Sequence, residues 1–583
     1  MRDVIVIGSG GGGAVVAKEL AAQGLDVLVL EAGGHPQDTE KEWTHYETAA
    51  QARLRWGPSN PMQPAWQREN FAGGTLLQSS GVGGTTNLYF GNSPRAMPGA
   101  FAGYDGADKD MYDTGYLFPF SYNELRPYYH WVEKTLPVQT AAMGTKEEIF
   151  LSGAEAMGLT HMKTKDIHCD SYRPQENAIL QPGGFAGLSD NEYLTSFPLA
   201  KGCTYCGHCM QGCYLPMKAP RNLKAKRSTY NSYVPMALTA DMWSFCGKAA
   251  EIISDAFVTK VLTDESSSDM KATGVQFRIS TTGELFEETA KVVVMACGAI
   301  ETPRLWLNSG LPDPNGWVGK GLTNHATEVV VGVMPFETKS SYGPASAARV
   351  DFPGRGCLES FGATPGGEAA LSFLGSYAGF AHMNGDDPTY REGRLVGAEL
   401  KDVMSDMDRL LNVLVITDDD VDPSNAVMLS DTHAPDEHGA VPRVTGPGIA
   451  NLTARTHANR EFLTEKAIEL VKAAGATKVI RAKTPPSMIH LQSSMRMGLD
   501  ESNSVLDENC ESRAVTGLYV ADNSALANAI GGPNPTLTTQ ALATRTAEKI
   551  FKKHFGGHGW VRSQAPVSSV DFKVTMACYK RGI

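Results

Sequence analysis

The residues with the clearest chemical potential are four cysteines crowded into one short segment. The segment reads CTYCGHCMQGC and contains Cys203, Cys206, Cys209 and Cys213, with the spacing C-x2-C-x2-C-x3-C. This spacing is typical of small iron–sulfur electron carriers, in which cysteine thiolates ligate the cluster. Glycines inside the segment give the backbone freedom to turn N–H groups toward the cluster sulfurs. The segment therefore predicts an iron–sulfur cluster, of the 4Fe–4S or the 3Fe–4S type.

Other states of these cysteines stay open. Four thiolates would also satisfy zinc, although structural zinc sites usually place a longer loop between two cysteine pairs. The thiols could instead be metal-free, whereas two disulfides are sterically awkward at this spacing. In two-cluster ferredoxins the fourth cysteine of such a run ligates the other cluster, and this chain has no second run. A cluster would therefore use all four cysteines, only three of them, or a remote ligand.

A second segment with chemical potential lies at the N-terminus. Residues 4–13 read VIVIGSGGGG, in which an apolar run meets Gly8, Gly10 and Gly13 at the spacing G-x-G-x-x-G. The next residues, AVVAKELAAQG, have helical periodicity, and VLVL then reads as a second strand that ends at Glu31. This order of strand, glycine turn, helix, strand and acid predicts a dinucleotide-binding unit.

Each part of this N-terminal pattern has a physical task. Gly8 permits the tight turn, Gly10 lets the backbone approach a pyrophosphate, and Gly13 lets helix and strand pack closely. Free N–H groups at the helix N-terminus favour a phosphate there. Glu31 can accept hydrogen bonds from ribose hydroxyls. The pattern alone does not separate NAD from FAD.

The rest of the chain supplies the elements that must position these segments. Helical patterns predict helices at about 123–135, 456–474 and 536–554. Strands and hairpins are predicted over 250–300, and VVVGVM and NVLVIT read as further strands. The tail from Gly556 contains Gly, Ser and Pro and is assigned no element.

Composition and charge narrow the class of protein. The chain has 583 residues, is 42% hydrophobic and 20% charged, and has a net charge of −12 without a run of like charges, so nucleic-acid binding is not expected. No stretch approaches the roughly 18 apolar residues of a membrane span. The first strand begins at Asp3, which leaves no room for a secretory signal. We expect a cytoplasmic protein, or one exported in the folded state with a partner that carries the signal.

Five further segments carry a resemblance to one family. They are GVGGTTN at 81–87, CGAIETPRLWLNSG at 297–310, VGKGLTNH at 318–325, IHLQSSMRMG at 489–498 and GLYVADNSALANAIGGPNPTLTTQALATRTAEKI at 517–550. Together with the N-terminal glycine turn, they resemble the glucose–methanol–choline (GMC) family of FAD oxidoreductases. The resemblance covers most of the chain and is weakest at about 100–195 and 335–420, where that family varies its substrate domain.

The resemblance implies an α/β fold with an α+β second domain. A discontinuous, Rossmann-like FAD-binding domain would comprise 1–105, 200–330 and 485–556, with the cysteine-rich insert at 203–213. A substrate-binding domain with an antiparallel sheet would comprise 106–199 and 331–484. Residues 557–583 would form a C-terminal tail.

The resemblance also implies a set of cofactor-binding residues. Gly8, Gly10, Gly13 and Glu31 would hold the ADP half of FAD, and the backbone of Val258 would hold the adenine. The residues expected near the pyrophosphate or the flavin ring are Gly83, Gly84, Asn87, Asp522, Pro535 and Thr536. Some members of the family attach FAD through a histidine in the segment that reads GGTTN here. Because this segment has no histidine, we expect non-covalent FAD.

Two catalytic residues follow from the same resemblance. Alcohol oxidation needs a base for the hydroxyl proton, and His490 is expected to be that base because the pKa of histidine lies near working pH. Asn534 is expected to supply a neutral amide donor beside it. His325 matches a family position as well, and we expect it to support the site rather than to react.

The implied function is oxidation of a CH–OH group of a sugar or other alcohol to a carbonyl, by hydride transfer to flavin N5. Bacterial sugar dehydrogenases of the family carry a cluster in the corresponding region, with different cysteine spacing. Electrons would then leave through the cluster to an acceptor protein or small subunit. In the alternative, suggested by sterol-oxidising relatives with a similar run, the enzyme is an oxidase that uses O₂ and the cysteines are structural. A flavin-binding module without turnover is a third reading.

Overall fold

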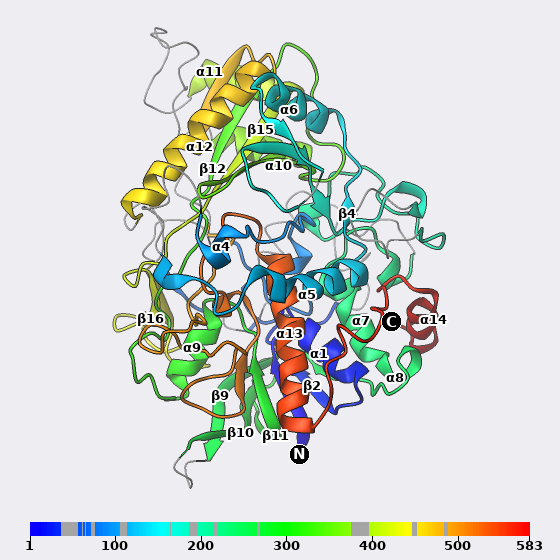
Figure 1. The fold of residues 1–583 in the computed structure, drawn as a ribbon, viewed down its shortest axis with the longest axis vertical. Coiled ribbons are helices and arrows are strands. Elements are labelled where there is room, and N and C mark those ends of the chain that lie inside the picture. The colour runs from blue at the N-terminus through cyan, green and yellow to red at the C-terminus, as the bar shows by residue number, and fades with distance from the viewer. Residues whose placement is uncertain are drawn as a thin grey trace.

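Two seven-stranded sheets organise the chain in the computed structural model (Figure 1). The residues that the structure describes are 1–36, 56–60, 62–63, 66–70, 76–104, 114–163, 165–185, 196–213, 219–264, 269–374, 396–445, 452–482 and 488–583. In this part of the chain, no helix is long and apolar enough to cross a membrane.

The first sheet is mixed, because β11 pairs in parallel with β1 and β19 and in antiparallel fashion with β10. Its order is β8-β2-β1-β11-β10-β9, and β19 also pairs with β11. The parallel strands are β8 (Glu251–Ile253), β2 (Val27–Leu30), β1 (Arg2–Ile7), β11 (Leu285–Met295) and β19 (Leu518–Val520). The antiparallel ones are β10 (Lys271–Ile279) and β9 (Ala256–Asp264). The apolar runs of β1 and β2 are buried because helices cover a parallel sheet on both faces.

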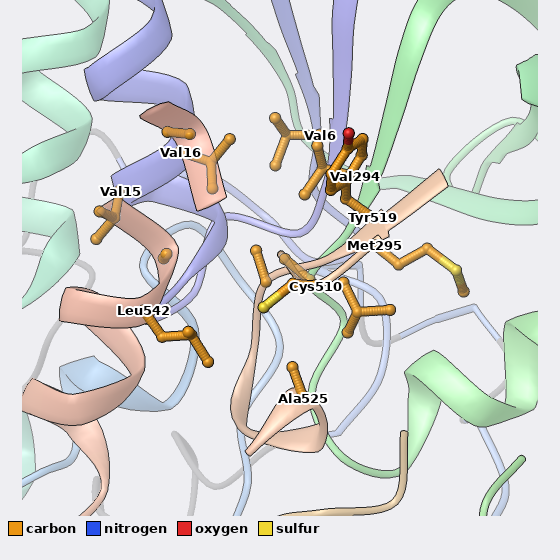
Figure 2. Close-up of a cluster of buried hydrophobic side chains, with 14 of the residues drawn as sticks. Val6, Val15, Val16, Val294, Met295, Cys510, Tyr519, Ala525 and Leu542 are labelled. Carbon is orange, nitrogen blue, oxygen red and sulfur yellow. The ribbon is translucent and has the colours of Figure 1, made fainter. Parts of the chain in front are cut away.

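Helices from opposite ends of the chain close the core of the first sheet. They are α1 (Gly13–Ala22), α5 (Tyr122–Thr135), α7 (Tyr233–Leu238) and α13 (Thr536–Phe555). Figure 2 shows Val6 and Val294 of the strands with Val15 and Val16 of α1 and Leu542 of α13. All five of these side chains are fully buried, so the first and last predicted helices share one core.

The second sheet is antiparallel except at one edge. Its order is β18-β12-β15-β14-β13-β6-β5, and only β5 and β6 pair in parallel. The strands are β18 (Lys478–Ala482), β12 (Glu328–Val333), β15 (Leu410–Thr417), β14 (Gly356–Phe361), β13 (Ala348–Phe352), β6 (Ser171–Pro174) and β5 (Thr160–His161). Helices α6 (Thr145–Ala156) and α12 (Ala454–Ala473) share a core with one face of this sheet, in the upper part of Figure 1.

Smaller elements complete the described chain. Two small sheets are formed by β16 (Ala426–Leu429), β17 (Pro442–Thr445) and β3 (Glu69–Asn70), and by β4 (Gln139–Thr140) and β7 (Glu176–Asn177). The remaining α-helices are α4 (Gly99–Ala102), α8 (Ala240–Trp243), α9 (Glu301–Asn308), α10 (Pro365–Leu374), α11 (Gly397–Ser405) and α14 (Phe572–Arg581). Single 3₁₀ turns lie at Gly84–Asn87, Thr114–Tyr116, Pro182–Gly184, Cys209–Gln211, Arg221–Leu223, Thr229–Asn231, Met407–Arg409 and Asn523–Ala525.

The expected fold class is confirmed, and the three long predicted helices are α5, α12 and α13. The tail beyond Gly556 differs from its expectation because it ends in helix α14. Asp571 caps that helix through a hydrogen bond from Lys573 N, and Val574 and Cys578 pack against Met236. A capping Asp followed by apolar residues at helical spacing is the signal that could have identified it.

Candidate active site

A cavity of about 500 Å³ is lined by residues of both large sheets. Ten of the residues singled out from the sequence line it: Gly8, Gly10, Glu31, Gly84, Val258, His490, Asp522, Asn534, Pro535 and Thr536. The described positions of Gly13, Gly83, Asn87 and the four clustered cysteines lie outside its lining. The cavity therefore brings the N-terminal glycine turn and the two expected catalytic residues into one space.

The glycine turn forms an open cradle at one end of the cavity. A Cβ atom built on Gly10 would meet no heavy atom within 4 Å, whereas one on Gly13 would lie 2.0 Å from the carbonyl oxygen of Gly8. A Cβ on Gly84 would lie 2.9 Å from Gly10 Cα. No side chain caps the N-terminus of α1. Gly10 therefore borders open space at an uncapped helix end, which is where a phosphate binds.

Glu31 ties three segments of this cradle together. Its Oε2 accepts hydrogen bonds from the backbone N–H of Ser9 at 2.9 Å and from the Ser9 hydroxyl at 2.6 Å. Its Oε1 accepts from the N–H groups of Gly33 and Gly81, each at 3.1 Å. Burial raises the pKa of Glu31, and these four hydrogen bonds oppose that rise. Ser9, which also accepts from Gly83 N at 3.1 Å, is a site residue that motif reasoning missed.

Asp522 joins the segment around Gly298, which follows β11, to the 3₁₀ turn Asn523–Ala525. Its Oδ2 accepts from Gly298 N at 2.9 Å and from the Thr302 hydroxyl at 2.6 Å, and its Oδ1 accepts from Ser524 N at 2.7 Å. The segment 81–87 is held differently, because Asn87 donates from Nδ2 to the carbonyl of Val82 and its Oδ1 has no partner among the described residues. Asp522 and Asn87 therefore both form hydrogen bonds within the protein that fix the backbone around the cavity.

His490 meets a second histidine at the other end of the cavity. The Nδ1 atoms of His490 and His325 lie 3.0 Å apart, and His325 Nε2 lies 2.7 Å from the carbonyl oxygen of Ala529. A carbonyl oxygen only accepts, so His325 Nε2 carries a proton and its Nδ1 is the acceptor. The Gln492 amide also lies 3.0 Å from His325 Nε2, and this tautomer requires the amide to turn its otherwise unpartnered oxygen toward that nitrogen. His490 Nδ1 must then be the donor, which leaves His490 Nε2 with a lone pair.

Both imidazoles are neutral at ordinary pH. Burial lowers the pKa of His325 to about 4. Burial, the neighbouring His325 and the Arg349 guanidinium together lower the pKa of His490 well below its usual value. The bare Nε2 of His490 lies 3.5 Å from Asn534 Nδ2. The arrangement presents a proton acceptor and an amide donor side by side at the cavity.

A buried polar network holds Asn534. Its side chain hydrogen-bonds Glu359, which also accepts from Arg349 Nη1 at 3.2 Å and from Asn92 Nδ2 at 2.8 Å. Burial raises the pKa of Glu359 to about 7, and Arg349 opposes that rise. The Oδ1 atom of Asn534 has no hydrogen-bond partner in the described chain. Glu359 therefore positions the amide so that its Nδ2, 3.5 Å from His490 Nε2, can donate to a ligand beside that histidine.

The backbone around His490 is fixed by residues that sequence reasoning did not single out. Asn324 accepts through Oδ1 from the N–H groups of Ile489 and His490 at 3.1 and 3.2 Å. Asp419 in turn accepts from Ala326 N at 3.0 Å. Asn324 precedes His325 directly, so the motif LTNH carried a signal for it.

The four clustered cysteines pack beside the cavity rather than in it. Cys209 and Cys213 belong to a buried apolar cluster that Cys203 and Phe90 also contact, and Met210 between them lines the cavity. Burial and the neighbouring thiols raise the pKa of Cys209 to about 12. No disulfide joins any of the ten cysteines, all of which lie in the described part of the chain.

The structure gives no support to the predicted cluster in the cysteine segment. Within the described ranges, no group of three or more His, Cys, Asp or Glu side chains is arranged so that it could hold a metal ion. Lys226 donates through Nζ to the Cys209 carbonyl at 2.6 Å and through its N–H to Cys213 Sγ at 3.2 Å. In this arrangement the cysteines pack as apolar thiols, and it does not fit an iron–sulfur cluster.

Comparison with known families identifies the family of the chain. Two models of one family, GMC oxidoreductase, match residues 75–327 and 447–543, and together they span more than half of the sequence. The chain belongs to the GMC oxidoreductase family. A model described as an NAD(P)-binding Rossmann-like domain matches residues 6–67.

Known relatives span nearly the whole chain at low identity. The 2-methyl-1,2-propanediol dehydrogenase of Mycolicibacterium austroafricanum is 26% identical, over 94% of this chain and 95% of its own length. The paromamine 6'-oxidase of Streptomyces fradiae is 26% identical, over 94% and 91%. Among solved structures, the formate oxidase of Aspergillus oryzae has a TM-score of 0.62 at 13% identity, over 95% and 99%, and shares the fold.

FAD is the cofactor that this membership and the Rossmann-like match support. The structure fits such a group because Gly10 borders open space at an uncapped helix N-terminus. Gly10 and Gly12 offer a matched test. A Cβ on Gly12 would lie 1.5 Å from the carbonyl oxygen of Ala521, whereas one on Gly10 would meet no heavy atom within 4 Å.

We expect Gly10→Ala and Gly12→Ala to fail in different ways. Gly10→Ala should leave the stability of the FAD-stripped protein unchanged but weaken FAD binding at least tenfold, because the methyl group occupies the phosphate approach. Gly12→Ala should lower the free energy of unfolding by about 3 kcal/mol or more through backbone overlap. Denaturant unfolding and FAD titration measure the two effects. Equal losses of stability in both variants would contradict the assignment, and Gly283→Ala, at an open hairpin turn, is the control for FAD affinity.

Proposed function

We propose that this GMC oxidoreductase oxidises a CH–OH group of an alcohol or sugar to a carbonyl, with His490 as the base. One observation carries the proposal: the contact with His325 leaves the lone pair on His490 Nε2, the atom that lies beside Asn534 at the cavity. Bound FAD supplies the acceptor for the hydride that leaves the substrate carbon.

The protein groups act on the substrate oxygen. His490 Nε2 takes the hydroxyl proton, and the positive charge that develops strengthens its Nδ1–H hydrogen bond to His325. The amide of Asn534 donates to the oxygen while negative charge grows there. Because both groups are held by hydrogen bonds within the protein, they need no rearrangement during the reaction.

The same proposal assigns the cofactor contacts. The cradle of Gly8, Gly10 and Gly84 would face the pyrophosphate, and the backbone of Val258 would face the adenine. Pro535 and Thr536 would lie along the flavin. The segment GGTTN offers no histidine for attachment, so FAD would be bound without a covalent link. All six of the named residues line the cavity, which supports this placement.

The route by which electrons leave is a separate question with two candidate answers. The sequence predicts a cluster on the 203–213 segment that would serve an acceptor protein or small subunit. The packing of Cys209 and Cys213 in an apolar cluster favours the other candidate, an oxidase with structural cysteines. The two relatives named above are a dehydrogenase and an oxidase.

Replacing the base should slow the reaction without releasing the cofactor. For His490→Ala we expect the rate of anaerobic flavin bleaching by a reactive alcohol to fall by about 10²- to 10⁴-fold, the usual contribution of a positioned base. The flavin absorbance spectrum measures both the bleaching rate and FAD occupancy. His558→Ala removes an exposed histidine and is the control. Wild-type bleaching in His490→Ala would disprove the assignment.

The pH dependence follows from the lowered pKa of His490. A base with a pKa below its usual value stays unprotonated until the solution becomes clearly acidic. We therefore expect the second-order rate constant of flavin reduction to stay constant from pH 8 down to pH 6.5, and to fall only well below that. Stopped-flow reduction at constant FAD occupancy measures the profile. A loss of half the rate at or above pH 6.5 would contradict the neutral pair of histidines.

Iron content separates the two electron routes. We expect less than one iron and one acid-labile sulfide per FAD in protein purified without oxygen, with hydrogen peroxide formed when air is admitted. Metal analysis and a peroxide assay measure both quantities. Three or four irons per FAD, with little peroxide, would restore the predicted cluster and overturn the assignment of structural cysteines.

A further inference from the structure

One side of the cavity is an apolar wall built from distant parts of the chain. Its residues are Phe90, Met210, Val329, Phe361 and Leu414, all of which line the cavity. The five side chains also contact one another through a single apolar cluster. The rings of Phe90 and Phe361 stack with their centroids 5.2 Å apart. The wall is therefore a continuous surface rather than scattered apolar contacts.

The register of the second sheet creates this wall. Val329 of β12 pairs with Leu414 of β15, so both side chains stand on the same face. The adjacent residues Val330 and Val413 belong to the core beneath α6 and α12. Since successive side chains in a strand point to opposite faces, the face turned away from those helices is the one that lines the cavity.

Few polar groups interrupt the wall among the described residues. Glu328 lines the cavity, but its carboxylate is engaged by Arg460 and Arg481. The Tyr89 hydroxyl donates to the carbonyl of Arg227 at 2.9 Å. Thr327 and Asn92 also line the cavity, and Asn92 Oδ1 has no partner in the described chain.

We propose that the site takes an alcohol with an apolar body, aliphatic or aromatic, rather than a sugar. The CH–OH group would lie at His490 and Asn534, and the hydrocarbon would cover the wall. Each methylene removed from water favours binding. Each ring hydroxyl of a sugar placed on this wall would lose its hydrogen bonds to water without replacement. This inference rests on the proposed function, because it names the substrate class of the same site.

The cysteine segment acquires a structural role in this arrangement. Met210 lies in the 3₁₀ turn Cys209–Gln211, between two cysteines that are buried in an apolar cluster. The thiols anchor that turn, and Met210 is the residue of the segment that lines the cavity. Its flexible, polarisable side chain suits contact with varied hydrocarbon shapes.

Binding of alkyl amides to the FAD-loaded protein tests the wall separately from turnover. Acetamide, butanamide and hexanamide have a polar end for His490 and Asn534 but no CH–OH to oxidise. We expect their dissociation constants, read from perturbation of the flavin spectrum, to fall about fourfold for each added methylene. An affinity that is independent of chain length, or tighter binding of sorbitol than of hexanamide, would overturn the proposal.

Two variants test whether the dependence of amide affinity on chain length arises at the apolar wall. Met210→Gln and Val329→Thr each place a polar group of similar shape on the wall, and each should weaken hexanamide binding at least fivefold while acetamide changes little. Met428→Gln alters an exposed methionine of β16 and is the control. Unchanged hexanamide affinity in both wall variants would refute the assignment.

Alcohol reduction of the flavin distinguishes this proposal from the proposed function. We expect 1-hexanol to reduce the flavin with a second-order rate constant at least 100-fold above that of glucose. If no alcohol or sugar reduces the flavin but amide affinity still rises with chain length, the proposed function fails and the apolar wall stands. If glucose reduces the flavin with a larger rate constant than 1-hexanol, the proposed substrate class is wrong and the proposed function stands.

Discussion

The contact between His325 and His490 is the interaction on which the reactive end of the cavity depends. Two imidazole nitrogens 3.0 Å apart are stable neighbours only when one carries a proton and the other does not. The Ala529 carbonyl decides which nitrogen is protonated, because it accepts a hydrogen bond from His325 Nε2 and so leaves His325 Nδ1 without a proton. His325 adopts a φ of +32°, an unusual value for a residue other than glycine, so the fold holds it there against a local conformational cost.

The second sheet brings His325 and His490 together. Strands β12 and β18 pair in antiparallel fashion, so the segment that enters β12 and the segment that leaves β18 lie at the same end. His325 lies in the first segment and His490 in the second, and a bridge between Thr323 and Gln492 continues the pairing between them. The hydrogen bonds of Asn324 then set the backbone angle at His490. Long-range strand pairing thus creates the contact between the two histidines.

The same sheet divides the cavity into a polar end and an apolar side. Its cavity face carries Val329 and Leu414 on β12 and β15, followed in register by Glu359 and Arg349 on β14 and β13. The charged pair is fully buried, and Asn92 and Asn534 also hydrogen-bond Glu359, which offsets the cost of burying its carboxylate. The apolar pair remains at the cavity. One row of side chains therefore positions the Asn534 amide and lines the apolar side of the cavity.

The sequence by itself determined the features whose causes are local. The spacing of Gly8, Gly10 and Gly13 between two apolar runs specifies the phosphate cradle, because turn, helix start and strand are neighbours along the chain. Helical periodicity located α12 and α13, and motif resemblance identified His490 and Asn534 as candidates. Only the tertiary structure decided which nitrogen of His490 is left unprotonated, since its partner His325 is 165 residues away and Ala529 lies 204 residues from that partner. Ligand spacing sets which metals the cysteine segment could hold, whereas tertiary packing decides whether its thiols converge.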